Sequence, residues 1–173
     1  LIDLNVSLRE PGYTSKGSVL SETKAAVAGG VTQLCCSPQT SPVNDSRAVT
    51  KLIKELASSA GYCDVFPLGA LTRGLKGEQL SEYAALKSAQ CIALSNAAKG
   101  SVEQLRIAKQ SGAKVTADVA IQNLLYTDDM TEAFSSIYHC LPPLREDSDR
   151  QALIAGIIDG TIDAITSAHQ PHE

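Results

Sequence analysis

The sequence predicts an α/β protein built on a parallel sheet or barrel. Two observations lead to this class. Apolar runs of strand length alternate along the 173 residues with stretches of helical composition. Polar side chains collect in the loops that follow the apolar runs, which is where parallel α/β folds carry their chemistry.

The first half of the chain alternates between the two kinds of element. Strands are predicted at residues 1–6, 31–36, 64–71 and 91–94, and helices at residues 21–28, 46–60 and 80–88. Gly29 and Gly30 end the first helix. The second helix has apolar residues at helical spacing, and Asp45 or Ser46 is its predicted N-cap.

The second half continues the alternation. Helices are predicted at residues 102–111 and 150–158, each followed by a glycine, and strands at residues 114–119 and 162–165. Residues 145–150 form a run of charges that we interpret as a solvated helix start with acidic residues near its N-terminus.

The composition excludes several classes of protein. Lys and Arg total 15 against 19 Asp and Glu, and the net charge of −4 argues against a nucleic-acid binder with a basic surface. No apolar run approaches the roughly 18 residues of a membrane span. The five cysteines are odd in number and follow no secretory segment, so we expect free, mostly buried thiols in a cytoplasmic protein.

Several segments carry a family resemblance. Residues 2–12 read Ile-Asp-Leu-Asn-Val-Ser-Leu-Arg-Glu-Pro-Gly and resemble the opening of the dihydroorotases, where the strand leads into His-x-His-Leu-Arg-Glu-Pro-Gly. Residues 167–172, Ser-Ala-His-Gln-Pro-His, are similar to the family's Asp-His-Ala-Pro-His motif. Further matching segments are residues 26–32, 36–42, 67–77, 141–145, 149–153 and 159–165.

The resemblance implies a (β/α)8 barrel of the metal-dependent amidohydrolase type. Members of the family close dihydroorotate from carbamoyl aspartate or reopen it. Their zinc lies at the C-terminal ends of the strands, where a metal-bound hydroxide attacks the ring amide and an aspartate on the last strand shuttles the proton.

This sequence departs from the family at the positions that carry the chemistry. Asn5 and Ser7 stand where the family has the first two histidine ligands, and the region of Gln122 and Asn123 lacks the histidine expected there. Ala168 stands at the position of the aspartate. Amide and hydroxyl groups are poor zinc ligands and a methyl group cannot exchange a proton, so we predict neither a metal nor a catalytic residue.

A second set of family positions is partly kept. Arg9 and His172 match the arginine and histidine that hold the substrate carboxylate in the family, and Gln39 stands at the position of an asparagine. These three side chains are candidates for binding a carboxylate. The alternative is that Arg9 and His172 brace loops over the mouth of the barrel.

The length raises a question about the barrel. We predict one amidohydrolase-like domain over residues 1–173, with the first strands in about 1–96 and the late strands in about 102–173. A full barrel needs about 250 residues. Either the gene carries a deletion, or a stretch is absent between residues 96 and 102, and we favour the second. The chain opens inside an apolar run without Met, so we also expect flanking sequence on both sides.

Three hypotheses of function follow. In the first, the protein is an inactive dihydroorotase homologue that forms a hetero-oligomer with aspartate transcarbamoylase, as the resemblance suggests, and binds no zinc. In the second, it is an active dihydroorotase or other cyclic amidase with an altered metal site. In the third, it is a metal-free module that binds a small carboxylate. The first is the one we prefer, since fold and activity are inherited separately.

Overall fold

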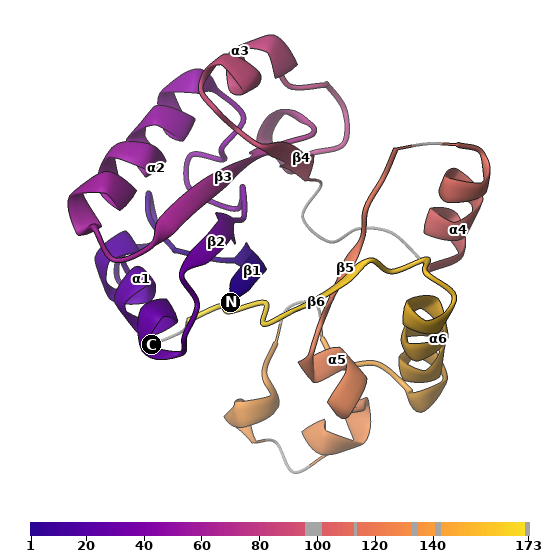
Figure 1. Ribbon diagram of the computed structural model, residues 1–173. Coiled ribbons are helices and arrows are strands. Elements are labelled where there is room, and N and C mark those ends of the chain that lie inside the picture. The colour runs from indigo at the N-terminus through magenta and orange to yellow at the C-terminus, as the bar shows by residue number, and fades with distance from the viewer. Residues whose placement is uncertain (96–101, 113, 133–134, 141–142, 172–173) are drawn as a thin grey trace. The chain divides into compact units, whose positions relative to one another are not determined.

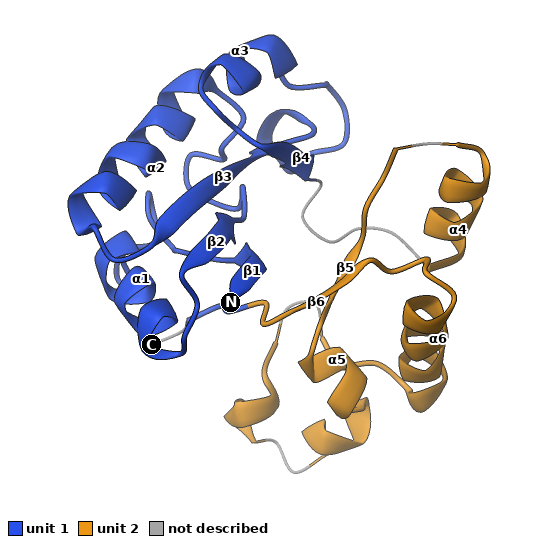
Figure 2. Ribbon diagram, viewed as in Figure 1, with its two compact units in different colours: residues 1–97, 169–173 blue, residues 98–168 orange. Residues whose placement is uncertain are grey.

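The computed structural model describes residues 1–95, 102–112, 114–132, 135–140 and 143–171 (Figure 1). It divides into two compact units (Figure 2). The first unit holds residues 1–97 and 169–173, and the second holds residues 98–168. Strands pair in parallel in both units, which confirms the predicted α/β class with parallel strands.

The first unit is a four-stranded parallel sheet with its strands in chain order, β1-β2-β3-β4. Its elements are β1 (Ile2–Val6), α1 (Val19–Ala28), β2 (Gln33–Cys36), α2 (Arg47–Ala60), β3 (Asp64–Ala70), α3 (Tyr83–Ser88) and β4 (Ala93–Ser95), with a short 3-10 helix at Arg73–Leu75. Each strand is joined to the next by a crossover that contains a helix, as parallel neighbours require.

The core of this unit lies between the sheet and its first two helices. Leu34 of β2 and Ile53 of α2 are completely buried and belong to one apolar cluster. The other members of this cluster are Val6, Leu8, Val19, Cys36, Val49 and Ala57. Burying a side chain such as Ile53 stabilises the fold by roughly 1.5–3 kcal/mol. The apolar residues that α2 carries on one face therefore hold this helix against the sheet.

The structure corrects the predicted start of α1 and agrees with that of α2. Ser18 is the N-cap of α1, and its hydroxyl accepts a hydrogen bond from the Ser21 amide at 3.1 Å. The predicted start at residue 21 is therefore late. Ser46, one of the two candidates, stands at the N-cap of α2. Gly61 ends this helix in the left-handed conformation that glycine adopts easily, with φ of 68°.

The second unit contains a two-stranded parallel sheet and its flanking helices. Its elements are α4 (Val102–Gln110), β5 (Asp118–Ala120), α5 (Gln122–Leu125), α6 (Asp147–Ile158) and β6 (Ala164–Thr166), with 3-10 helices at Asp128–Thr131 and Ser136–Tyr138. Lys109 of α4 ties this unit together, because its Nζ atom lies 2.7 Å from a carboxylate oxygen of Asp163. The same carboxylate accepts a hydrogen bond from the Ala117 amide at 2.8 Å.

Several element boundaries differ from those predicted. The third helix begins at Tyr83 rather than residue 80, because Leu80 forms a β-bridge with Thr72. The strand predicted at 114–119 is limited to Asp118–Ala120, the residues that pair with β6. The last helix begins at Asp147 within the charged run, with Asp147 and Asp149 in its first turn as interpreted from the sequence.

The described residues contain six strands, in sheets of four and two, so they do not by themselves complete an eight-stranded barrel. Residues 96–101, where a stretch of chain is predicted to be absent, lie outside the described residues, and that expectation stays a prediction. Over the described ranges, no helix combines the length and apolar character required to cross a bilayer.

All five cysteines are free thiols. Cys35 and Cys36 are buried, and the other three are half-buried. Burial raises the pKa of the Cys36 thiol to about 12. This side chain therefore behaves as a small apolar residue, as predicted, whereas Cys63, Cys91 and Cys140 are less buried than predicted.

Candidate functional site

The end of β1 carries the first two positions where the resemblance places metal ligands. Asn5 is half-buried and its backbone amide donates to Asp3 Oδ1 at 3.2 Å. Ser7 is buried, and its amide donates to the carbonyl oxygen of His169 at 2.9 Å. Val6 forms a parallel bridge with His169. The segment that follows β6 thus pairs with the end of β1.

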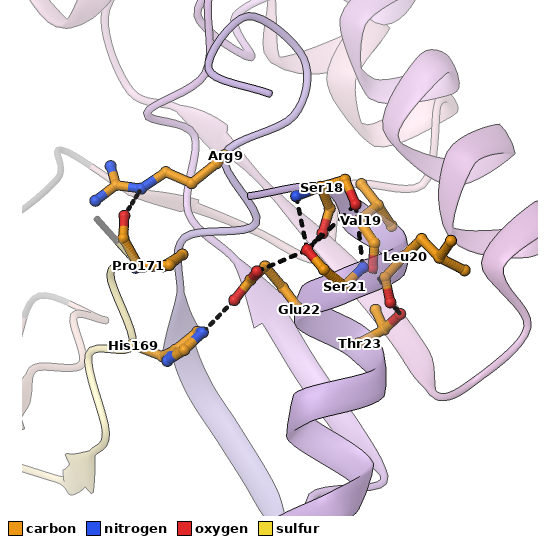
Figure 3. Close-up of polar contacts among 9 residues, drawn as sticks. All are labelled: Arg9, Ser18, Val19, Leu20, Ser21, Glu22, Thr23, His169 and Pro171. Carbon is orange, nitrogen blue, oxygen red and sulfur yellow. Dashed lines mark hydrogen bonds and ion pairs between the residues drawn. The ribbon is translucent and has the colours of Figure 1, made fainter. Parts of the chain in front are cut away.

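Arg9 follows β1 and also contacts that segment (Figure 3). Its Nε donates to the Pro171 carbonyl oxygen at 3.0 Å. Its backbone is left-handed, with φ of 62°. Burial lowers the pKa of Arg9, while the charges of Tyr13 and Glu22 oppose this shift. This hydrogen bond joins Arg9 to the segment that carries Pro171, and the choice between carboxylate binding and bracing stays a prediction.

An ion pair that sequence reasoning missed lies beside Arg9. His169 Nε2 is 2.5 Å from Glu22 Oε2, and the Ser21 hydroxyl donates to the other carboxylate oxygen at 2.8 Å (Figure 3). Glu22 is on α1 and is only 7% exposed. In the sequence it is one acidic residue in the first turn of a helix, and nothing there distinguishes it from a solvated glutamate.

Gln39 lies in the loop between β2 and α2 and is exposed. Asn44, in the same loop, is fully buried. Asn44 Nδ2 donates to the Leu68 carbonyl oxygen at 2.9 Å, and its Oδ1 accepts from the Thr50 hydroxyl at 2.7 Å. His172 lies outside the described residues. The structure therefore describes two of the three candidates for carboxylate binding.

The remaining positions belong to the second unit. Gln122 and Asn123, expected in a loop after a strand, lie in the short helix α5, directly after β5. Asn123 Oδ1 is buried and has no hydrogen-bond partner among the described residues. Ala168 is half-buried and has a positive φ of 50°. Its methyl group offers neither a metal ligand nor a proton.

The donor chemistry of the described residues does not suit zinc. A catalytic zinc takes about three protein donors, drawn from imidazole, carboxylate and thiolate groups. Across the described ranges, no group of three or more His, Cys, Asp or Glu side chains is placed to hold a metal ion. The positions that would supply such ligands in the family carry an amide at Asn5 and a hydroxyl at Ser7.

The family model described as dihydro-orotase-like matches residues 1–139. The chain belongs to the dihydroorotase-like family. This family membership agrees with the motif order along the sequence and with the parallel α/β fold.

Relatives of this dihydroorotase-like chain support the assignment. It is 38% identical to a dihydroorotase-like protein of Pseudomonas putida and 35% identical to one of Pseudomonas aeruginosa, in each case over 100% of this chain and 60% of the relative. It is 30% identical to a dihydroorotase of Syntrophotalea carbinolica, over 99% of this chain and 60% of the relative.

The chain thus spans about 60% of the length of these curated relatives. The alignment with the Pseudomonas putida protein extends over 255 residues, although the chain has 173. That relative therefore contains residues, within the aligned region, that have no counterpart here.

Solved structures share the fold. An L-hydantoinase of Arthrobacter aurescens matches with a TM-score of 0.73 at 16% identity, over 99% of this chain and 58% of the hydantoinase. An inactive dihydroorotase-like domain of a Chaetomium thermophilum CAD-like multifunctional protein matches with a TM-score of 0.59 at 14% identity, over 96% of this chain and 62% of that domain's chain. These structure neighbours are amidohydrolase TIM-barrel proteins, so the chain has the fold of part of such a barrel.

Proposed function

We propose that this dihydroorotase-like protein is catalytically inactive and serves as a structural subunit of aspartate transcarbamoylase. The observation that carries the proposal is the chemistry of three positions. Asn5, Ser7 and Ala168 replace two histidines and an aspartate, so the groups that would hold the metal and move the proton are missing together. A residue elsewhere in a longer chain cannot restore these three.

The names of two similar proteins support the proposal. The Pseudomonas putida relative is called dihydroorotase-like rather than dihydroorotase. The Chaetomium thermophilum domain is described as inactive and belongs to a multifunctional protein. Both are consistent with a scaffold that is retained after the loss of its reaction.

The proposed protein binds no zinc and acts in the cytoplasm as part of a hetero-oligomer with the aspartate transcarbamoylase chain. It contacts neither nucleic acid nor membrane. Its net charge of −4 supports the first of these exclusions, because binding to the phosphate backbone is dominated by basic side chains. In such a subunit, selection acts on the fold and the contact surface.

The test is an assay of the full-length protein, purified together with its transcarbamoylase. We expect the two to co-purify, and we expect no hydrolysis of dihydroorotate and no cyclisation of carbamoyl aspartate with zinc present. The Syntrophotalea carbinolica dihydroorotase is the positive control for the assay. Turnover at a comparable rate, or stoichiometric zinc by metal analysis, would overturn the proposal.

The second candidate is an active dihydroorotase with an altered metal site. It is favoured by the relatives at about 30% identity that carry the name dihydroorotase. The zinc and activity measurements above separate it from the inactive subunit.

A third candidate is a metal-free carboxylate-binding module that uses Arg9, Gln39 and His172. The half-buried guanidinium of Arg9 favours it, although Nε is already occupied by Pro171. Calorimetric titration with carbamoyl aspartate, comparing the wild type with Arg9→Ala, tests this module. An absence of binding heat in the wild type would exclude it.

We also propose that the full-length protein contains a further stretch of chain between residues 96 and 102. The extent of the alignment with the Pseudomonas putida relative supports this proposal. Mass spectrometry of the intact protein from its host should give a mass well above 18.2 kDa. A tryptic digest should also give peptides that match neither the sequence before residue 96 nor the sequence after residue 102. A peptide left uncut after Lys99 that runs from residue 95 to residue 102 through residues 96–101 alone would contradict the proposal.

A further inference from the structure

We propose that Glu22 and His169 form a clasp that fixes residues 169–171 to the end of β1 without a metal. The inference rests on the proposed absence of zinc. It assigns Glu22 a positioning role that follows from its contacts.

The ion pair is the first part of the clasp. His169 Nε2 lies 2.5 Å from Glu22 Oε2, and the Glu22 side chain is only 9% exposed, compared with 41% for His169 (Figure 3). A buried carboxylate is unfavourable unless it is paired and hydrogen-bonded. Glu22 meets this requirement with His169 on one oxygen and the Ser21 hydroxyl on the other.

Backbone pairing is the second part. Among the described strands β1 lies at one end of the four-stranded sheet, and the Ser7 amide donates to the His169 carbonyl oxygen at 2.9 Å. The imidazole that reaches Glu22 belongs to the same residue as this carbonyl. The contact with Glu22 therefore holds in place the residue that pairs with the end of β1.

Close packing around Pro171 is the third part. The Arg9 guanidinium donates to its carbonyl oxygen at 3.0 Å. A Cβ atom added at Gly17 would lie 2.7 Å from Glu22 Oε1 and 3.3 Å from Pro171 Cγ. The start of α1 therefore lies against both the carboxylate and the segment that the carboxylate retains.

The clasp lies next to the positions that have lost metal-ligand chemistry. Ser7 is hydrogen-bonded to His169, and Ala168 directly precedes His169 in the chain. None of Asn5, Ser7 and Ala168 carries an imidazole, carboxylate or thiolate group, and the hydrogen bond between Glu22 and His169 joins α1 to residues 169–171 without a metal.

The test measures amide exchange at Ser7 in the full-length protein by NMR. Glu22→Gln keeps the shape of the side chain and removes its charge, and we expect exchange at Ser7 to become at least about tenfold faster. His169→Gln should have a similar effect, and the double variant should exchange no faster than the single variants. Glu55→Gln, at an exposed glutamate of α2, is the matched control and should change nothing.

Unchanged exchange at Ser7 in both single variants, or additive effects in the double variant, would overturn the clasp. A second measurement needs no variant. The ¹⁵N spectrum of the His169 ring in the wild type should show a proton on Nε2, because that nitrogen must donate to the carboxylate. An unprotonated Nε2 would also overturn the proposal.

Addition of zinc alone separates this inference from the proposed function. If zinc raises the melting temperature of the wild type and supports hydrolysis, the proposed inactivity fails, whatever happens at Ser7. If zinc has no effect and Ser7 exchange is insensitive to Glu22→Gln, the proposed inactivity stands and the clasp fails.

Discussion

Replacement of Asn44 by alanine should be among the most damaging polar substitutions in the first unit. The side chain of Asn44 is fully buried and joins three elements. It donates to the Leu68 carbonyl oxygen in β3 at 2.9 Å and accepts from the Thr50 hydroxyl of α2 at 2.7 Å. It thereby holds the loop that carries Gln39 against the sheet.

The expected loss follows from these contacts. Each hydrogen bond contributes about 1 kcal/mol, and the half-buried Leu68 carbonyl adds part of the roughly 1–3 kcal/mol that a buried group without a partner costs. Thr50 keeps a second acceptor, the Ser46 carbonyl oxygen at 3.1 Å. By contrast, the Leu68 carbonyl oxygen and the more distant Cys91 Sγ atom, at 3.9 Å, lose their side-chain donor. We expect Asn44→Ala to lower the free energy of unfolding by about 3 kcal/mol.

Urea denaturation followed by circular dichroism measures this loss. Thr50→Val removes one of the two hydrogen bonds and should cost less, about 1–2 kcal/mol. Asn123→Ala is the matched control, because the Asn123 side-chain oxygen has no partner among the described residues, and it should cost least. If Asn44→Ala stays within about 0.5 kcal/mol of the wild type, the reasoning from buried polar contacts is refuted.

Two further predictions concern backbone strain and acid stability. Gly12→Ala should lower the free energy of unfolding, measured by urea denaturation, by at least about 3 kcal/mol, since φ is +101° and a Cβ atom would lie 2.1 Å from the Ser41 carbonyl oxygen. The control is Gly77→Ala, where φ is +81° but the space is open, and it should lower the free energy of unfolding by only about 1–2 kcal/mol. Equal losses in the two variants would contradict the prediction. Hydrogen bonds from Thr161, and then from Arg106, lower the pKa of Asp159 from 3.8 to about 2. Because the pKa of Asp159 is lower in the folded state, its ionised carboxylate stabilises the fold above pH 3.8, and this stabilisation disappears as the pH falls towards 2. Asp159→Asn should flatten the dependence of unfolding free energy on pH over that interval, and an unchanged slope would argue against it.

The alternation of strands and helices was readable from the sequence because its causes are local. Helical spacing predicted α2 almost to the residue, since one face of that helix must supply Val49 and Ile53 to the core. The replacement of ligand chemistry at Asn5, Ser7 and Ala168 was equally readable, because a side chain's capacity to bind metal or move a proton depends on its type. The ends of an element were less predictable where pairing with another strand sets them. Strand β5, for example, extends only over the residues that pair with β6.

The contacts around Arg9 depended on the tertiary structure. Glu22 and His169 are 147 positions apart, so no local spacing marks them as a pair. Their interaction exists because the segment after β6 pairs with the edge of β1 beside the first turn of α1, which removes the carboxylate from water. A glutamate in the first turn of a helix is ordinarily solvated, whereas this one is buried and hydrogen-bonded to a histidine from a distant segment.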